Sequence, residues 1–286
     1  MRLRSACLLV VFGLEVTLAG AANGAVIYNN LTPNNLMGLA SRPDIGATEI
    51  EAADDFVLGA RTLVNGASFV GLLVPGTGLT PSISDVVAEM YRVFPADSNT
   101  TRTPNVPTRF NSPSDVALDS RDSASGGLTF TMSVLNPSFT VLNSVQPGGI
   151  HLAPPAGDGP LTGQEVQVNV TFTTPFDLSA DHYFFVPQVA LSGGAQFYWL
   201  SASRPISGPG TTPVAPDLQS WTRDAALDPD WLRVGTDIVG GAPAPTFNAA
   251  FSLEGNIVPE PATFTFLLGG LVAVTLRRFS VRGKRG

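Results

Sequence analysis

The sequence predicts an all-β chain, namely an antiparallel β-sandwich that is jelly-roll-like and is followed by a short C-terminal transmembrane helix. Alternation of apolar and polar residues recurs along residues 26–257, whereas long helical periodicity is nearly absent. With 14% charged residues, 29 Gly and 24 Pro among 286 residues, the composition suits short strands joined by turns and argues against coiled coils and helical bundles. The length allows one large β domain.

Residues 1–25 have the layout of a secretory signal peptide. Arg2 and Arg4 form the positively charged start, an apolar stretch follows, and the segment ends in mostly small residues that suit signal peptidase. A buried N-terminal helix is the alternative, but it would leave the two arginines unexplained. The single cysteine, Cys7, lies in this leader, so we expect an exported mature protein without disulfides, a catalytic thiol or a cysteine-based zinc site.

The body, residues 26–257, contains segments with the period of two that is typical of strands. In the clearest segment Val166, Val168 and Val170 alternate with polar residues, which predicts one packed face and one solvated face. Turn-rich sequence separates these segments, and the long stretch 95–127 indicates a functional loop or a further element. The predicted strands are 26–28, 55–58, 67–74, 128–134, 138–145, 165–173, 182–190, 196–201 and 247–253.

The segment 84–94 fits two structures. As a helix it would be capped by Ser84, and as a strand it would place Val87 and Tyr91 on one apolar face that Glu89 interrupts. We favour the strand, because prolines flank the segment and the surrounding pattern is β.

The last segment, residues 258–286, reads as a membrane-held tail. Two prolines make its start an extended spacer that donates few backbone hydrogen bonds. The uncharged run 262–276 would reach roughly 22 Å as a helix, against about 30 Å of hydrocarbon, so it predicts a short transmembrane helix. Positive flanks resist translocation, which predicts a cytoplasmic end. The spacer is Val258, Pro259, Glu260 and Pro261, and the basic cluster is Arg277, Arg278, Arg282, Lys284 and Arg285.

This order of Pro-Glu-Pro, short apolar helix and basic end, behind a signal peptide, resembles the PEP-CTERM sorting signal of bacteria that make extracellular polysaccharide. The resemblance covers 258–286. It implies recognition by a membrane-embedded exosortase, a cysteine transpeptidase that cuts near the tripeptide and passes the protein to the envelope or matrix. The short sequence segments 52–56 and 251–255 are similar to segments of exported β-sandwich proteins that carry this tail. This similarity implies no catalytic residues. An ordinary C-terminal membrane anchor is the alternative.

The charge of the body limits its partners. Residues 26–257 hold nine arginines and no lysine against 21 acidic residues, a net charge of −12. Such a domain repels nucleic-acid phosphates and anionic lipid, so the sequence predicts no nucleic-acid partner. Neutral sugars, cations and other proteins remain as candidates.

Three tryptophans, Trp199, Trp221 and Trp231, are candidate carbohydrate-binding residues. Sugar rings present apolar faces that stack on exposed aromatic side chains, so a groove lined by these residues would suit a polysaccharide. The alternative is that they pack in the core, which we favour for Trp199 because it lies inside a predicted strand.

Two aspartate pairs are candidate metal ligands for calcium: Asp54 with Asp55, and Asp228 with Asp230. Exported β domains hold calcium with turn carboxylates and backbone carbonyls, although Asp-Pro-Asp is also a good turn without metal. Further acidic candidates are Asp177, Asp181, Asp224 and Asp237.

The two histidines, His151 and His182, belong to no ligand or base motif, and we interpret His182 as structural. No Gly-x-Ser-x-Gly nucleophile elbow occurs, and a Ser-His-Asp triad assembled in space stays open.

Together these features predict an exported cell-surface or polysaccharide-matrix protein, sorted by an exosortase-like enzyme and acting as a non-catalytic structural or adhesion component. The partners would be signal peptidase, the exosortase, extracellular polysaccharide and, before processing, the membrane. One alternative is a secreted glycan hydrolase, which needs two carboxylates converging in a cleft. The other is a calcium-dependent carbohydrate-binding module, which needs clustered aspartate oxygens.

Overall fold

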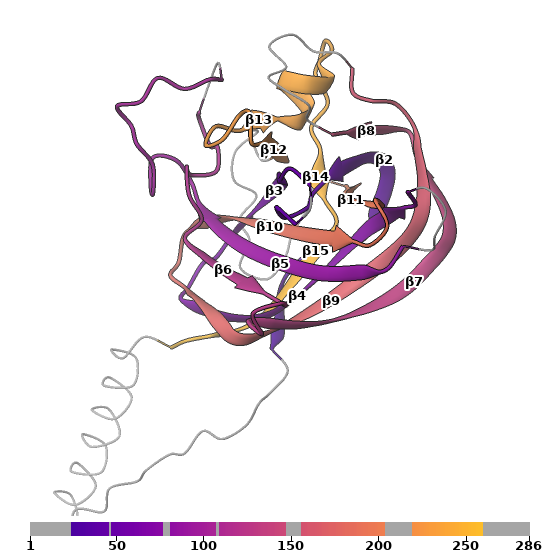
Figure 1. Ribbon diagram of the computed structural model, residues 1–286. Coiled ribbons are helices and arrows are strands. Elements are labelled where there is room, and N and C mark those ends of the chain that lie inside the picture. The colour runs from indigo at the N-terminus through magenta and orange to yellow at the C-terminus, as the bar shows by residue number, and fades with distance from the viewer. Residues whose placement is uncertain are drawn as a thin grey trace, which may run out of the picture.

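The computed structural model describes residues 24–45, 47–76, 81–106, 109–146, 156–203 and 219–259 (Figure 1). The predicted signal peptide up to residue 23, His151, and the tail from Glu260 onward, with its predicted helix and basic cluster, lie outside the described residues. Within the described ranges, no helix combines the length and the apolar character needed to cross a membrane.

The prediction of an all-β chain with antiparallel sheets is confirmed. The described strands form two sheets, of nine and six strands. The larger sheet contains β1 (Ala25–Asn29), β2 (Pro33–Ala40), β4 (Thr62–Val74), β7 (Leu128–Val141), β8 (Asn143–Val145), β9 (Leu161–Leu178), β11 (Gln196–Ala202), β14 (Asn248–Ala249) and β15 (Phe251–Ile257). The smaller sheet has the order β13 (Leu232–Arg233), β12 (Trp221–Asp224), β3 (Ile50–Val57), β10 (His182–Leu191), β5 (Ile83–Arg92) and β6 (Asp119–Asp122).

Strand β4 organises the larger sheet. Along one edge it pairs with β9, which pairs in turn with β7. Along the other edge it pairs first with β15, with Phe69 opposite Phe251, and then with β11, with Gly71 opposite Trp199. Strand β1 flanks β15, and β2 flanks β11. The short pairing of β2 with β8 is parallel, in contrast to the antiparallel pairs around it.

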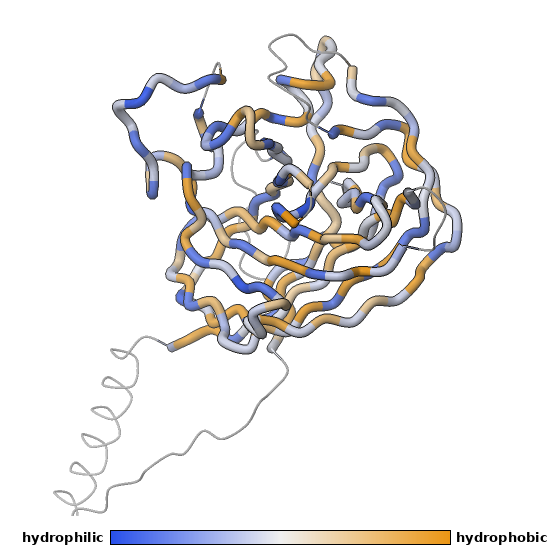
Figure 2. The backbone as a smooth tube through the Cα atoms, in the orientation of Figure 1, coloured by the Kyte–Doolittle hydropathy of each residue, from blue (hydrophilic) through white to orange (hydrophobic). Residues whose placement is uncertain are grey.

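The two sheets pack face to face on an aromatic core. Phe185 of β10 in the smaller sheet stacks on Phe251 of β15, with ring centroids 5.4 Å apart, and meets Trp199 of β11 edge to face at 6.0 Å. Burial of these large rings is the main driving force for joining the sheets. Apolar and polar residues alternate along strands such as β9, which turns its apolar face to this core, whereas β3 and β10 are buried along almost their whole length (Figure 2).

All nine predicted strands overlap observed strands, and 84–94 is strand β5, as favoured above. The sequence missed β2, β6, β12 and β13. Strand β2 begins Pro-Asn-Asn and its burial does not alternate, because its first half is exposed and its second half is buried against both neighbours. The long stretch after β5 contains β6, so the predicted loop is interrupted by a strand.

The described chain begins and ends at the same end of the molecule. Strands β1 and β15 are antiparallel, with Ala25 opposite Gly255. The backbone N–H of Val258 donates to the carbonyl of Arg61 at 2.8 Å, which fixes the chain just beyond β15 at the start of β4. The other end of β4, at Val74, pairs with Gln196 and therefore marks the opposite end of the molecule.

The close contact of β4 with β11 leaves no room for a side chain at position 71, so we predict that only glycine fits there. A Cβ atom there would overlap the Phe197 ring and lie 2.8 Å from the Tyr198 carbonyl oxygen. We expect Gly71→Ala to lower the free energy of unfolding by about 3 kcal/mol, because overpacking in a core displaces backbone. Gly66→Ala in the same strand is the control, since its Cβ would meet its nearest atom at 3.0 Å. Equal losses for the two variants in urea unfolding would contradict this account.

Candidate functional site

The outer face of the smaller sheet carries a cluster of ionisable side chains from three strands, which we call the Glu51 cluster: Glu51, Glu89, Tyr91 and Arg223. Antiparallel pairing places Arg223 of β12 directly opposite Glu51 of β3. The Arg223 Nε donates to the Glu51 carboxylate, and its Nη2 donates to the Tyr91 hydroxyl at 2.8 Å. The Tyr91 hydroxyl donates in turn to Glu51 Oε1 at 2.7 Å.

Three members of the cluster are shielded from water: the exposed fraction is 4% for Glu51, 3% for Tyr91 and 5% for Arg223. An ion pair in such a place is tolerated only when hydrogen bonds satisfy its remaining donors and acceptors. Burial lowers the pKa of Arg223, but the Glu51 carboxylate and the Tyr91 hydroxyl outweigh that effect and raise it. The guanidinium is therefore a permanent charge that neutralises Glu51.

Arg223 also holds two surface loops against the sheet. Its Nη1 donates to the carbonyl of Asp115 at 3.0 Å, in the stretch between β5 and β6, and to the carbonyl of Pro229 at 3.1 Å, in the stretch between β12 and β13. Its Cζ lies 4.4 Å from the centre of the Trp231 ring, a cation–π contact in a buried setting.

Glu89 is the unusual acid of the cluster. Its carboxyl lies 3.4 Å from the Tyr91 hydroxyl, on the same group that Glu51 contacts. Burial, followed by the negative charges of Glu51 and Glu49, raises the pKa of Glu89 to about 8. Glu89 is therefore protonated at neutral pH, beside a carboxylate that is neutralised by arginine.

A second set of ion pairs fixes the loop between β5 and β6. Arg102 binds the fully buried Asp230 through both Nη atoms, at 2.6 and 3.0 Å, and the Asn105 N–H donates to the same carboxylate. Burial raises the pKa of Asp230, but these donors outweigh it and lower the pKa overall. Arg109 pairs with Asp115 in the same loop. The long loop is thus attached by charged hydrogen bonds.

Two neighbouring carboxyl groups, one protonated and one ionised, are the chemical equipment of a glycosidase. In the Glu51 cluster, however, Glu51 is engaged by Tyr91 and Arg223 and buried beneath the loops that Arg223 holds. We therefore interpret the cluster as a structural clamp. The sequence signal for it was Glu89, which interrupts an otherwise apolar strand face; its partners are too distant in sequence to be found from a motif.

The three tryptophans do not form an exposed aromatic groove, because all of them are fully buried, and the core position favoured for Trp199 is confirmed. The Trp199 Nε1 donates to the carbonyl of Ala250 at 3.0 Å, and the Trp231 Nε1 donates to the carbonyl of Ser114 at 3.1 Å. Trp221 packs in the same outer-face cluster as Trp231. These rings have no open face on which a sugar could stack.

Asp54 and Asp55, predicted as metal ligands, are adjacent in β3 and so point to opposite faces of the sheet. Asp54 is fully buried and accepts hydrogen bonds from the Ala249 N–H at 2.8 Å and the Ser220 hydroxyl at 3.2 Å. Burial, followed by the charge of Asp55, raises the pKa of Asp54. The oxygens of Asp54 are thus engaged by protein donors, and Asp55 lies on the other face of the sheet, so the two carboxyl groups do not form one ion site.

The second predicted pair, Asp228 and Asp230, is also held by protein groups. Asp230 is bound by Arg102, and Asp228 lies 3.1 Å from an Arg223 nitrogen. Among the described residues, no group of three or more His, Cys, Asp or Glu side chains is arranged to hold a metal ion. The remaining acidic candidates do not gather either. Asp177 pairs with Arg61, Asp181 and Asp224 accept from nearby backbone N–H groups, and Asp237 accepts from the Arg233 N–H.

His182 is paired with Asp55, with 2.7 Å between Nε2 and Oδ2. Its ring also stacks on Phe184 at 5.4 Å. In the part of the chain that the structure describes, no serine or threonine hydroxyl is hydrogen-bonded to this ring. The described residues therefore supply two members of a triad without its nucleophile.

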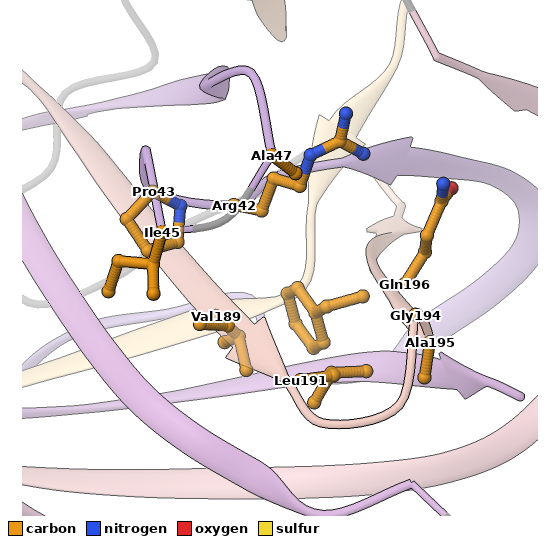
Figure 3. Close-up of a pocket in the computed structure, with 11 residues that line it drawn as sticks. Arg42, Pro43, Ile45, Ala47, Val189, Leu191, Gly194, Ala195 and Gln196 are labelled. Carbon is orange, nitrogen blue, oxygen red and sulfur yellow. The ribbon is translucent and has the colours of Figure 1, made fainter. Parts of the chain in front are cut away.

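The structure also contains a pocket of about 320 Å³ that the sequence did not indicate (Figure 3). It lies between the β2–β3 connection and the β10–β11 connection. Its lining is Arg42, Pro43, Ile45, Ala47, Val189, Ala190, Leu191, Gly194, Ala195, Gln196 and Phe197. Most of these side chains are apolar, and among the described lining residues the charged one is Arg42.

Comparisons with known proteins add no assignment. No protein-family model, no curated protein and no solved structure matches this chain. The resemblance of residues 258–286 to the PEP-CTERM signal therefore stays a prediction from the residues themselves.

The clamp role of Arg223 predicts a large loss of stability when the arginine alone is removed. We expect Arg223→Met to lower the free energy of unfolding by about 3–5 kcal/mol, because Glu51 is left as a buried, unpaired charge. Adding Glu51→Gln should recover part of this loss. Arg61→Met, which breaks a half-exposed pair with Asp177, is the control and should cost much less, because exposed ion pairs contribute little to stability. Similar denaturation midpoints for the two single variants would refute the clamp.

Glu89 predicts a pH-dependent stability. Its pKa rises from 4.5 to about 8 on folding, so the native state keeps a proton that the unfolded chain releases in this window. The free energy of unfolding therefore falls as pH rises from about 4.5 to 8. Glu89→Gln should match the parent at pH 4 and exceed it by roughly 1–4 kcal/mol at pH 9. Thermal unfolding across pH tests this, and parallel curves for the two proteins would contradict it.

Proposed function

We propose that this chain is an exported protein whose body is delivered to the cell envelope or extracellular polysaccharide matrix, where it acts as a non-catalytic structural or adhesion component. The observation that carries the proposal is the order of the C-terminal sequence: a Pro-Glu-Pro spacer, a short apolar run and a basic end. An exosortase-like membrane enzyme would read this order. The leader 1–25 would direct export and be removed by signal peptidase.

The junction between body and tail suits this role. Strand β15 ends at Ile257, and the spacer follows at once. Pro259 is exposed and carries no backbone donor, which favours an accessible, extended cleavage segment. Removing the residues beyond the spacer would leave the described strands and their core complete.

The position of the two ends also supports the proposal. Because Ala25 lies opposite Gly255, the leader and the tail would both be attached at one end of the body. A membrane that holds the tail would then hold the body by that end. The opposite end of β4, with the pocket, would point away from the lipid.

The chain path supports the finer assignment of a jelly-roll-like sandwich, whereas the short transmembrane helix is proposed from the apolar run 262–276 of the sequence alone. The chain crosses between the sheets repeatedly, for example from β2 to β3, from β4 to β5 and from β10 to β11. Such crossings are usual in sandwiches of antiparallel sheets.

The chemistry of the acidic residues supports a non-catalytic role. In the described part of the chain, Glu51, Asp115 and Asp230 are each neutralised by an arginine and buried. These ion pairs attach loops to the smaller sheet. The net negative charge of the body repels anionic lipid. This repulsion suits a domain that is held at a membrane only through its tail.

Two epitopes on one chain test the proposal. One epitope is placed after Lys284 and the other in the open turn at Gly126, where an added side chain would meet nothing within 4 Å. We expect the body recovered from the cell surface or matrix to keep the Gly126 epitope and to have lost the one after Lys284. We also expect deletion of 258–286 to change the destination of the body.

A matched variant separates sorting from simple anchoring. Replacing both Pro259 and Pro261 by alanine keeps the apolar run and the basic end, so an ordinary anchor would still work. Sorting by an exosortase-like enzyme predicts that this variant stays membrane-bound with both epitopes. Recovery of both epitopes on surface protein of the parent chain, or an unchanged destination after the deletion, would contradict the proposal.

A further inference from the structure

We propose that the pocket between the β2–β3 and β10–β11 connections binds a small organic carboxylate with an apolar body, and that Arg42 holds the carboxylate. This inference goes beyond the proposed function and stands independently of it. It rests on the shape and lining of the pocket, on the state of the Arg42 guanidinium and on the charge of the surrounding body.

The walls of the pocket are apolar although they are open to solvent. Ile45, at the tip of the β2–β3 connection, is 52% exposed and faces the pocket together with Pro43 (Figure 3). Val189, Leu191 and the buried ring of Phe197 complete the apolar lining. The volume of about 320 Å³ is within the range of small-molecule sites, which are lined mainly by apolar side chains with a few polar groups.

The polar groups lie together on one side of the pocket. Arg42 and Gln196 extend their polar heads in the same direction, beside the apolar lining (Figure 3). The Tyr198 hydroxyl lies within hydrogen-bonding distance of two acceptors, Gln146 Oε1 at 2.8 Å and Gln196 Oε1 at 2.9 Å, so the Gln196 amide is part of a polar group at this side of the pocket. Burial, against the opposing effect of Tyr198, lowers the pKa of Arg42, yet an arginine keeps its charge under all ordinary conditions.

The orientation of Arg42 is fixed by its own loop. Its Nε donates to the carbonyl of Thr48 at 2.9 Å, so the two Nη groups remain to meet a ligand. The loop is closed at its base by two backbone hydrogen bonds between Arg42 and Ile50, at 2.8 and 3.0 Å. A guanidinium held in this way loses little conformational entropy on binding.

Arg42 differs in its partner from six other arginines of the described residues. Its described hydrogen bond is to a backbone carbonyl, whereas six other described arginines each pair with a carboxylate. Those six are Arg61, Arg92, Arg102, Arg109, Arg121 and Arg223. The body has 21 acidic residues and nine arginines, yet the described partner of Arg42 is a carbonyl and not a carboxylate. The Arg42 guanidinium is therefore available to bind the carboxylate of a ligand.

The same facts favour a carboxylate over other anions. Two Nη groups of one guanidinium match the two oxygens of a planar carboxylate. A phosphate carries more negative charge, and a body with a net charge of −12 and one arginine in the site would repel it. The apolar walls require that the rest of the ligand present apolar surface.

The pocket is rigidly framed on both sides. The Ser41 hydroxyl donates to the carbonyl of Pro187 at 2.6 Å, and the Val189 N–H donates to the carbonyl of Ser41 at 3.2 Å. Ser41 thereby ties the larger sheet to β10 at the pocket floor. On the other side, Gly193 and Gly194 both have φ of +70°, a backbone conformation that favours glycine and allows the tight β10–β11 turn.

The test is binding of two probes to the purified full chain by isothermal titration calorimetry. One probe is 2-naphthoate, an apolar carboxylate, and its uncharged control is 2-naphthamide. The other is methyl glucuronide, a carboxylate on a sugar, and its uncharged control is methyl glucoside. We expect 2-naphthoate to bind at least tenfold more tightly than 2-naphthamide and at least tenfold more tightly than methyl glucuronide, because the apolar walls favour an apolar body over a sugar.

Variants assign the binding to the pocket. Arg42→Met keeps the apolar stem and removes the charge, so it should weaken carboxylate binding at least tenfold. Ile45→Ser should weaken 2-naphthoate at least threefold; its side chain is half exposed, so folding should be unaffected. Arg61→Met, the same change at the opposite end of β4, should leave binding unchanged. Absence of 2-naphthoate binding, equal binding of 2-naphthamide, binding of methyl glucuronide in preference to 2-naphthoate, or unchanged binding in Arg42→Met with a native melting curve would overturn the proposal.

Discussion

The buried ion pair between Arg223 and Glu51 is the interaction on which the smaller sheet and its loops depend. It joins β12 to β3 on the outer face, and the remaining donor of Arg223 reaches the carbonyls of Asp115 and Pro229 in two separate loops. The aromatic core can join the inner faces of the sheets by apolar burial alone. Within the described ranges, no further sheet covers the outer face of the smaller sheet, and the loops that Arg223 attaches take that place.

This arrangement explains how an acidic body uses its few positive charges. Arg102, Arg109 and Arg223 neutralise carboxylates that are buried under the loops. These guanidinium groups contribute to folding and are already paired, so they are poorly placed to bind a ligand. Arg42 lies in the β2–β3 connection, paired with Ile50 at the start of β3, and the partner of its side chain is a backbone carbonyl. The division of roles among the arginines separates a structural face from a pocket suited to binding. In the proposed function, that pocket is at the end of the body away from the membrane.

The sequence predicted the fold well where apolar and polar residues alternate. Strand β9 was clear because one of its faces packs on the core and the other meets water. Strand β3 was predicted only at its end, because Glu51 and Asp54 read as exposed residues and are in fact buried with partners from distant strands. For the same reason the tryptophans were misplaced: Trp221 and Trp231 lie in turn-rich sequence, and the loops that bury them are folded back by ion pairs that no local pattern reveals. The pocket was missed because its two walls are about 150 residues apart in the chain, as for Arg42 and Gln196.

The most direct test of the central role of the Arg223–Glu51 pair is native-state hydrogen exchange of the loop amides that are held by side chains. The Asn99 N–H donates to the Asp115 carboxylate at 2.8 Å, and the Asp115 N–H donates to the Ser98 hydroxyl at 2.9 Å. If the ion pairs make the loop part of the folded unit, these amides exchange with the same opening free energy as the amides of β5. Exchange of the two loop amides at a much lower opening free energy, while β5 stays protected, would contradict the account.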